Sequence, residues 1–208
     1  MMNKDRLAVL IGKNGITKKR IQYLTNTIIE IDSTTGDYTL HPQETVEMDT
    51  EIEKFLEQMD ISPDTLKIYK EAPNFGVWTA KKIIEAVNLG FKPEKAFKLV
   101  NQDYIFETIS LEDAIGSSQK MIKRIKGRLI GEGGVMRSSI EKYSTAFISI
   151  YGNYVGFIAD FDSLKIAQKA VDMIIEGLPL KTVTTFLQKR HRERKEKEFH
   201  ETWKPTFD

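Results

Sequence analysis

Two short glycine motifs carry the clearest chemical signal in the sequence. The first reads Gly-Lys-Asn-Gly at 12–15, and the second reads Gly-Glu-Gly-Gly at 131–134. A Gly-x-x-Gly turn between two helices lets a phosphodiester approach the backbone, because no Cβ stands in the way, and it directs the next helix's free N–H groups at the anion. In RNA recognition, a KH loop of this kind grips the backbone of about four nucleotides. The motifs therefore predict two clamps for single-stranded RNA.

The charges around the two motifs differ. Cations lie in the first loop and on the helix after it, and phosphate contacts of this kind give salt-sensitive affinity. In the second loop Glu132 places a negative charge where phosphate should pass, and the flanking Lys126, Arg128 and Arg137 would have to offset it. The candidate RNA-binding residues are Gly12, Lys13, Asn14, Gly15, Lys18, Lys19, Arg20, Arg128, Gly131, Glu132, Gly133, Gly134 and Arg137.

The motifs belong to a longer internal repeat. The sequence matches itself at an offset of 119 residues, and Ile21 then meets Ile140 while Ile29 meets Ile148. In each copy, apolar residues at helical spacing follow the glycines, and alternating segments and a turn come next. Each copy is predicted to run helix, glycine loop, helix, strand, turn, strand. A lone Gly-x-x-Gly is more often a helix-ending turn, but two copies in matching contexts favour binding loops.

A second match, at an offset of 87 residues, relates 80–100 to 167–187. The first copy therefore carries 32 additional residues, roughly 41–72, in which acidic residues outnumber lysines nine to three. We expect this insert to form an acidic surface that keeps away from RNA.

Four longer segments make the pattern more specific than glycine loops alone. They are Leu10–Gly15, Ala80–Phe97, Lys126–Gly134 and Ile148–Gly152. With them the chain resembles, over about residues 5–190, the archaeal KH-domain proteins related to the Dim-two or partner-of-Nob ribosome assembly factors. The resemblance implies a protein of small-subunit maturation that binds the single-stranded 3′ region of small-subunit ribosomal RNA. It also implies two partners, the Nob-type endonuclease that cuts there and the alpha subunit of translation initiation factor two.

The expected fold class is α+β, with two tandem type I KH domains of βααββα order and helices on one face of each three-stranded sheet. The domains are predicted at 1–102, including the insert, and at 103–190. The second has room for an opening strand at 104–111, whereas only 11 residues precede Gly12, so the first strand looks clipped. Either Met1 is an internal start, or residues 1–3 supply a vestigial strand.

Residues 191–208 are expected to form a basic and aromatic tail. The segment 189–197 has seven basic residues against two glutamates, and it either tracks RNA phosphates or is a solvated helix end. The segment 199–208 lacks helical periodicity, which predicts a partner-binding peptide or disorder.

The amino-acid composition excludes several classes of protein. The chain of 208 residues has no cysteine, which excludes disulfides and thiolate chemistry, and its 31 basic and 30 acidic residues give a net charge of only +1. No apolar run approaches the roughly 18 residues of a membrane span, so a cytoplasmic protein without a membrane partner is expected. The first motif is not a nucleotide-binding P-loop, and the three scattered histidines form no catalytic or metal constellation. We predict neither an enzyme nor a cofactor.

Two other interpretations remain open. The KH folds could serve only as a scaffold, with the insert and tail holding protein partners. Alternatively, the protein could be a general RNA-decay or transcription adaptor, which keeps the RNA chemistry and changes the pathway. Salt dependence of RNA binding separates the first of these from the RNA-binding prediction.

Overall fold

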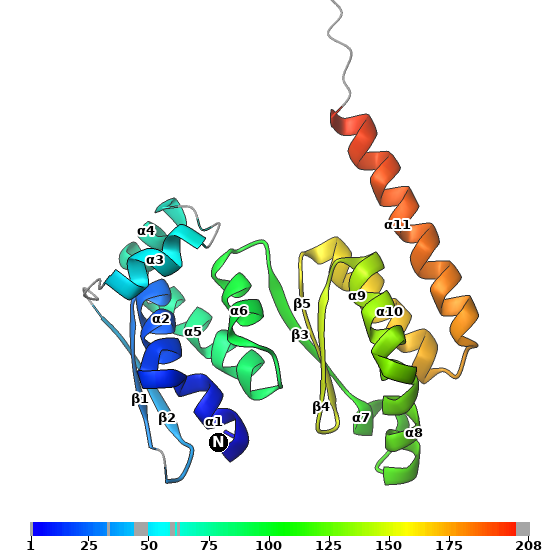
Figure 1. Cartoon of the computed structure of the whole chain (residues 1–208), viewed down its shortest axis with the longest axis horizontal. Helices are drawn as coiled ribbons and strands as arrows, with labels where there is room; N and C mark the ends of the chain where they lie inside the picture. Colours follow the sequence, from blue (N-terminus) through cyan, green and yellow to red (C-terminus); the bar gives the residue numbers. More distant parts are fainter. Residues whose placement is uncertain (1, 33, 44–49, 59–60, 62, 203–208) are drawn as a thin grey trace, which may run out of the picture. The chain divides into compact units, whose positions relative to one another are not determined.

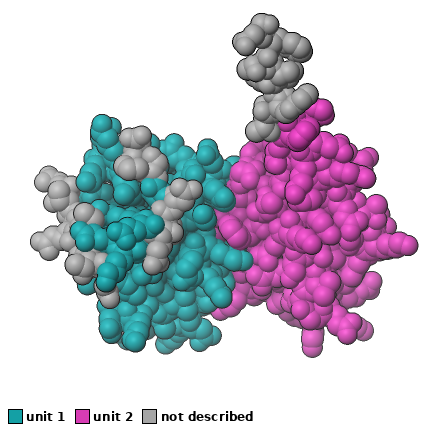
Figure 2. Space-filling model, turned by 45° about the horizontal axis from the view of Figure 1, so that its top comes forward, with its two compact units in different colours: residues 1–106 teal, residues 107–208 magenta. Residues whose placement is uncertain are grey.

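A computed structural model describes residues 2–32, 34–43, 50–58, 61 and 63–202. The chain divides into two compact units, residues 1–106 and 107–208 (Figure 2). Within the described residues, unit 1 holds a two-stranded sheet of order β1-β2, and unit 2 holds a three-stranded sheet of order β3-β5-β4 (Figure 1). Helices pack on both sheets, which confirms the α+β class.

Unit 1 begins with α1 (Lys4–Ile11), the 3₁₀ turn η1 (Lys13–Gly15) and α2 (Ile16–Thr25). An antiparallel hairpin of β1 (Thr27–Ile31) and β2 (Tyr38–Pro42) follows, with Ile29 opposite Leu40. Apolar residues at helical spacing on the two helices, such as Leu10 and Leu24, are fully buried. Helix, loop, helix, strand, turn and strand thus follow in the predicted order.

The opening strand expected at residues 1–3 is not formed by the two of these residues that the structure describes. The carbonyl of Asn3 accepts hydrogen bonds from the N–H groups of Arg6 (2.8 Å) and Leu7 (3.1 Å), so the backbone already turns into α1. The N–H of Met2 donates to the carbonyl of Gly36 (3.1 Å), in the β1–β2 turn. This vestigial-strand prediction is therefore wrong for residues 2 and 3.

The acidic insert forms two helices where the structure describes it, α3 (Thr50–Gln58) and α4 (Pro63–Glu71). Its apolar side packs onto α5 (Pro73–Asn88) and onto the 3₁₀ turn η2 (Phe97–Val100), which follows α6 (Pro93–Ala96). Phe55 meets Phe97 edge to face at 5.4 Å between ring centroids, and the buried Tyr69 hydroxyl donates to the carbonyl of Val100 (2.6 Å). Burying one such ring contributes about 1.5–3 kcal/mol. The insert is therefore an integral part of unit 1.

An opening strand is present in the predicted region as β3 (Ile105–Ser110). Its first two residues fall in unit 1 and the rest in unit 2, and the short helix α7 (Leu111–Ile115) follows it. Then come α8 (Gln119–Ile130), the 3₁₀ turn η3 (Glu132–Gly134) and α9 (Val135–Ser144). The hairpin of β4 (Phe147–Tyr151) and β5 (Tyr154–Ala159) turns through two residues, and α10 (Phe161–Ile175) and α11 (Leu180–Thr202) complete the unit. Strand β5 is central in the sheet, and each of its residues after Tyr154 is buried.

The last helix bears on both predictions for the tail: 189–197 lies within it, as the helix-end alternative predicted, and 199–202 is also helical, which corrects the prediction of a non-helical segment there. Helix α11 continues without a break from Leu180 to Thr202, so 191–202 is the distal half of a domain helix, and Phe199 lies within it (Figure 1). The Arg194 guanidinium ties this half to the unit, because it donates to the Ser144 carbonyl (3.0 Å) and to the Ser163 hydroxyl (3.1 Å). The segment 203–208 lies outside the described residues.

Candidate nucleic-acid interface

The two glycine loops have the same backbone conformation, position by position. The first glycine has φ 74° and ψ 175° at Gly12, and φ 74° and ψ 171° at Gly131. The third position has φ of 54° and 57° in the two loops, and the fourth has 78° and 83°. The N–H of each first glycine donates to the carbonyl four residues earlier, at 2.9 Å in both copies. The repeat in sequence is therefore a repeat in structure at the site of interest.

The first glycine of each loop is required by close packing. A Cβ on Gly12 would lie 2.9 Å from both the Cβ and the backbone N of Thr17, and closer still to the Thr17 hydroxyl. A Cβ on Gly131 would lie 2.8 Å from the backbone N of Met136. These glycines let the turn close against the start of the next helix.

The fourth position serves a different purpose. A Cβ on Gly15 or Gly134 would meet nothing within 4 Å, so the space in front of each residue is open. Each of these glycines precedes a helix, α2 or α9, and neither helix has a side-chain N-cap. The backbone N–H groups of a first helical turn attract anions when no side chain satisfies them. This end of each loop can therefore accept a phosphate.

The predicted cations of the first loop divide into two groups. Lys13 and Asn14 are exposed in the loop itself, Lys19 is exposed on α2, and Lys18 is half-buried. Arg20, in contrast, stacks its guanidinium over the Phe55 ring of the insert at 4.3 Å. The structure thus gives Arg20 a packing partner in α3, and we no longer count it among the phosphate contacts.

The cations predicted to offset Glu132 in the second loop all have protein partners. Lys126 donates to the carbonyl of Gly152 (2.7 Å) in the β4–β5 turn. The Arg137 guanidinium lies 3.6 Å from the Glu141 carboxylate. Arg128 donates to the carbonyls of Ile174 (2.9 Å) and Leu178, which ties α8 to the end of α10. Arg128 thus packs α8 against the end of α10, and its contact with RNA stays a prediction.

In unit 1 an arginine that the sequence did not single out makes the same kind of contact with two backbone carbonyls. Arg6 on α1 donates to the carbonyls of Val87 (2.8 Å) and Phe91 (2.5 Å). These two positions match Ile174 and Leu178 at the offset of 87 residues. Arg6 and Arg128 do not match at the offset of 119 residues that relates the two loops. The internal repeat therefore could not show that they make equivalent contacts.

Exposed apolar residues beside the second loop were also missed. Ile130 precedes the loop and is 39% exposed, and Val135 follows it and is 67% exposed. Val135 is the first of the apolar residues at helical spacing that follow the second loop, but the first turn of α9 points it to solvent. Apolar side chains next to a KH loop form the groove in which bases lie. The second loop is therefore bordered by exposed apolar side chains, whereas the equivalent Ile11 and Ile16 of the first loop are half-buried and exposed lysines lie beside them.

Comparison with known proteins agrees with this geometry. The family of the second KH domain of PNO1, a eukaryotic-type KH domain of type I, matches residues 105–192. A KH domain-containing protein of Methanocaldococcus jannaschii is 34% identical over 205 residues, covering 99% of this chain and 78% of that protein. The chain belongs to the PNO1-type family of KH-domain proteins. The predicted resemblance is thereby confirmed.

Two further PNO1-type comparisons define the extent of the likeness. A crystal structure of an a/eIF2alpha, aDim2p and rRNA complex from Pyrococcus horikoshii matches with a TM-score of 0.74 and 34% identity, covering 92% of each chain. RNA-binding protein PNO1 of Oryzias latipes is 28% identical over 116 residues, 55% of this chain and 48% of that protein. The chain thus spans about half the length of that PNO1.

Within the described residues of this PNO1-type chain, every helix is too short or too polar to cross a membrane. The same part of the chain also holds no cluster of three or more acidic or histidine side chains arranged to bind a metal ion.

Proposed function

We propose that this protein is a non-enzymatic RNA-binding factor of small-subunit ribosome maturation, built from two tandem type I KH domains. The observation that carries this proposal is the shared loop geometry, in which the first glycine is packed and the fourth is open toward solvent. A backbone that is open at the N-terminus of a helix suits a phosphodiester, and two such loops suit a single strand.

The assignment of unit 1 as a KH domain rests on its likeness to unit 2. Both units have the same loop, flanked by helices of matching position and followed by a β-hairpin. Both also fasten the end of their later helix with an arginine, Arg6 or Arg128. Unit 1 departs from the type I pattern in having two strands among its described residues.

The two loops would contribute differently to RNA binding. The first loop supplies charge, because Lys13 and Lys19 are exposed beside it. The second presents Glu132 to solvent but has Ile130 and Val135 as apolar neighbours, which suit contact with bases. We therefore assign the main phosphate clamp to the first loop and a larger share of base contacts to the second.

The relatives support the pathway. A PNO1 relative in Schizosaccharomyces pombe is a pre-rRNA-processing protein, 28% identical over 97 residues. That relative and the a/eIF2alpha, aDim2p and rRNA complex support ribosomal RNA as the target. The resemblance found in the sequence narrows our proposal to the single-stranded 3′ region of small-subunit ribosomal RNA. The same complex supports the alpha subunit of translation initiation factor two as a partner, and the Nob-type endonuclease is a second proposed partner.

A binding titration tests this proposal. The purified protein is titrated against a single-stranded RNA copying the 3′ end of small-subunit ribosomal RNA and against a scrambled RNA, at two salt concentrations. Selective binding that weakens with salt is expected, because phosphate contacts release counterions. No binding to either RNA would contradict the proposal and favour a protein-interaction scaffold.

A further inference from the structure

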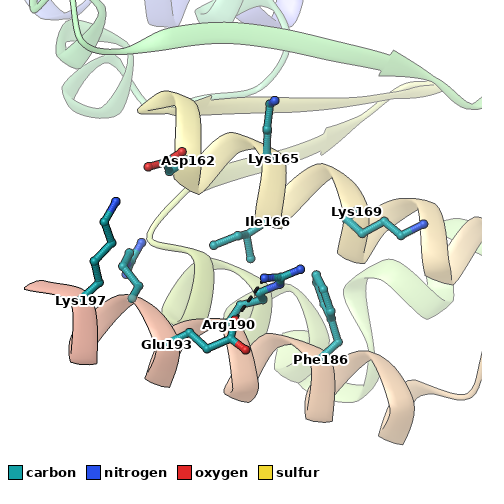
Figure 3. Close-up of a pocket in the computed structure, with 9 residues that line it drawn as sticks. Asp162, Lys165, Ile166, Lys169, Phe186, Arg190, Glu193 and Lys197 are labelled. Atoms are coloured by element: carbon teal, nitrogen blue, oxygen red, sulfur yellow. Dashed lines mark hydrogen bonds and ion pairs between the residues drawn. The ribbon is translucent and has the colours of Figure 1, made fainter.

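A groove of about 550 Å³ lies between α10 and α11 of unit 2, formed by residues distant from the glycine loop in sequence. Figure 3 shows Ile166 of α10 and Phe186 and Arg190 of α11 directed into it, whereas the Lys165 side chain extends from α10 away from α11. Its lining comprises Asp162, Lys165, Ile166, Lys169, Phe186, Arg190, Glu193, Arg194 and Lys197. Basic residues outnumber acidic ones five to two, so the groove is an electropositive feature of an otherwise nearly neutral chain.

The acidic charge in this groove is partly neutralised. The Glu193 carboxylate is paired with Arg190 (3.1 Å) and lies 3.9 Å from the Lys189 ammonium. Lys165 and Lys169 are both exposed on α10, one turn apart, which separates them by about 6 Å along the helix axis. Helix α10 therefore carries two neighbouring exposed cations at the edge of the groove.

Two of the cations that line the groove make cation–π contacts with aromatic rings. The Lys165 ammonium lies 4.3 Å from the centre of the Phe161 ring, and the Arg190 guanidinium lies 5.7 Å from that of Phe186. Proteins bind single-stranded nucleic acid with cations that contact the phosphates and with aromatic rings on which the bases stack. Arg190 and Phe186 both line the groove, whereas only Lys165 of the other pair does.

We propose that the groove between α10 and α11 is a second contact site for single-stranded RNA, reached by strands longer than those a single glycine loop holds. This inference rests on the proposed function and extends it. At the edge of the groove, Lys165 and Lys169 neutralise phosphates, and within it the Phe186 ring provides a stacking face.

An acidic peptide fits the groove less well. A peptide helix docks with anchors at i, i+3, i+4 and i+7, which requires a continuous apolar floor. Only Ile166 and Phe186 among the lining residues are apolar, and charged side chains surround them. The balance of charge over apolar surface favours a polyanion.

The test compares the parent protein with a groove variant and a matched control, using fluorescently labelled oligouridylates. The groove variant is Lys165→Gln with Lys169→Gln. The control is Lys181→Gln with Lys195→Gln, which removes two exposed cations of α11 outside the groove lining. The probes are about 4 and about 16 nucleotides long, the first matched to one KH loop and the second able to extend further.

For the longer RNA, the groove variant is expected to lower the log–log salt slope by about 1.4, since each phosphate contact to a single strand contributes about 0.7. Between about 50 and about 200 mM salt, the parent would then lose about sevenfold more affinity than the variant. Binding of the shorter RNA should not change, and the control should retain the parent's slope with both probes.

Two results would overturn the proposal. The first is a groove variant that binds the longer RNA with the parent's slope, which would leave an acidic protein segment as the ligand to test. The second is a control that changes as much as the groove variant, which would show a general charge effect. A groove effect in a protein whose loop variants bind normally would support this inference while contradicting the role proposed for the loops.

Discussion

Substituting Gly15 by Asp, with Gly15→Asn as its partner, separates charge from shape at the first loop. Gly15 has φ 78° and ψ 9°, a left-handed conformation in which a side chain costs roughly 1 kcal/mol and which Asn and Asp tolerate better than most residues. The adjacent Asn14 already adopts φ 54° and ψ 24°. Because a Cβ on Gly15 meets nothing within 4 Å, neither variant should clash with the fold.

The difference between these two variants measures repulsion of a phosphate. A carboxylate about 4 Å from a phosphate costs about 1 kcal/mol at the dielectric of water and about 4 kcal/mol near a protein surface. Gly15 lies in a solvent-facing loop, so we take about 1–2 kcal/mol, or roughly a 5- to 30-fold loss of affinity. Unfolding free energies should be nearly equal in the two variants, because both pay the same backbone cost.

Fluorescence anisotropy with single-stranded RNA and a urea denaturation of each variant provide the two readouts. The matching pair Gly134→Asp and Gly134→Asn tests the second loop, where we expect a smaller charge effect because Glu132 is already present. If Gly15→Asp binds RNA as tightly as Gly15→Asn at low salt, no phosphate approaches this loop and the assignment of the clamp is wrong.

Three further substitutions test the structural roles. Gly12→Ala should lower the free energy of unfolding by about 2 kcal/mol or more, from its positive φ and its clash with Thr17, and an unchanged urea midpoint would contradict this packing. Arg128→Met should cost about 1.5–3 kcal/mol in thermal denaturation, while the folded variant keeps its RNA affinity; weaker RNA binding at unchanged stability would instead support a contact of Arg128 with RNA. Asp160→Ala should cost about 1 kcal/mol at neutral pH, because the Asp160 carboxylate accepts a hydrogen bond from the Ser163 N–H (2.9 Å) at the start of α10. Burial alone would raise the pKa of Asp160, but its bonds with Ser163 and the nearby Arg194 outweigh burial and lower it. The folded pKa is thus below the unfolded value of about 3.9, so this stabilisation is present above about pH 4 and is lost as the pH falls through the folded pKa. The gap in unfolding free energy between parent and variant should therefore narrow below about pH 4, and a gap that persists there would contradict the assignment.

Much of the fold and the loops could be predicted from the sequence because local signals agree there. The glycines require positive φ, the residues after them have helical spacing, and the turn glycines separate alternating strands. Each of these signals depends only on residues close together in the sequence. The offset between the two matches gave the length of the insert, but its packing onto unit 1 was not predicted, because the apolar contacts of Phe55 and Tyr69 join segments distant in sequence.

The sequence did not indicate the packing partners of long side chains. Arg20, Arg128 and Arg137 were counted as phosphate contacts from their nearness in sequence to the loops. In the structure Arg20 stacks on Phe55 and Arg128 reaches carbonyls about 50 residues away. A long flexible side chain chooses its partner through tertiary packing, which sequence spacing does not encode. The exposed Val135 shows the same limit, because the first turn of a helix can project an apolar residue into solvent.

Photo-cross-linking with a single-stranded RNA of about five nucleotides, followed by mass spectrometry of the cross-linked peptides, tests the central claim most directly. A strand of this length is long enough for one loop. We predict cross-links within peptides that contain 12–20 or 130–137, and their loss from the first peptide in Gly15→Asp. Cross-links confined to the acidic insert or to α11, with none at either loop, would contradict the account.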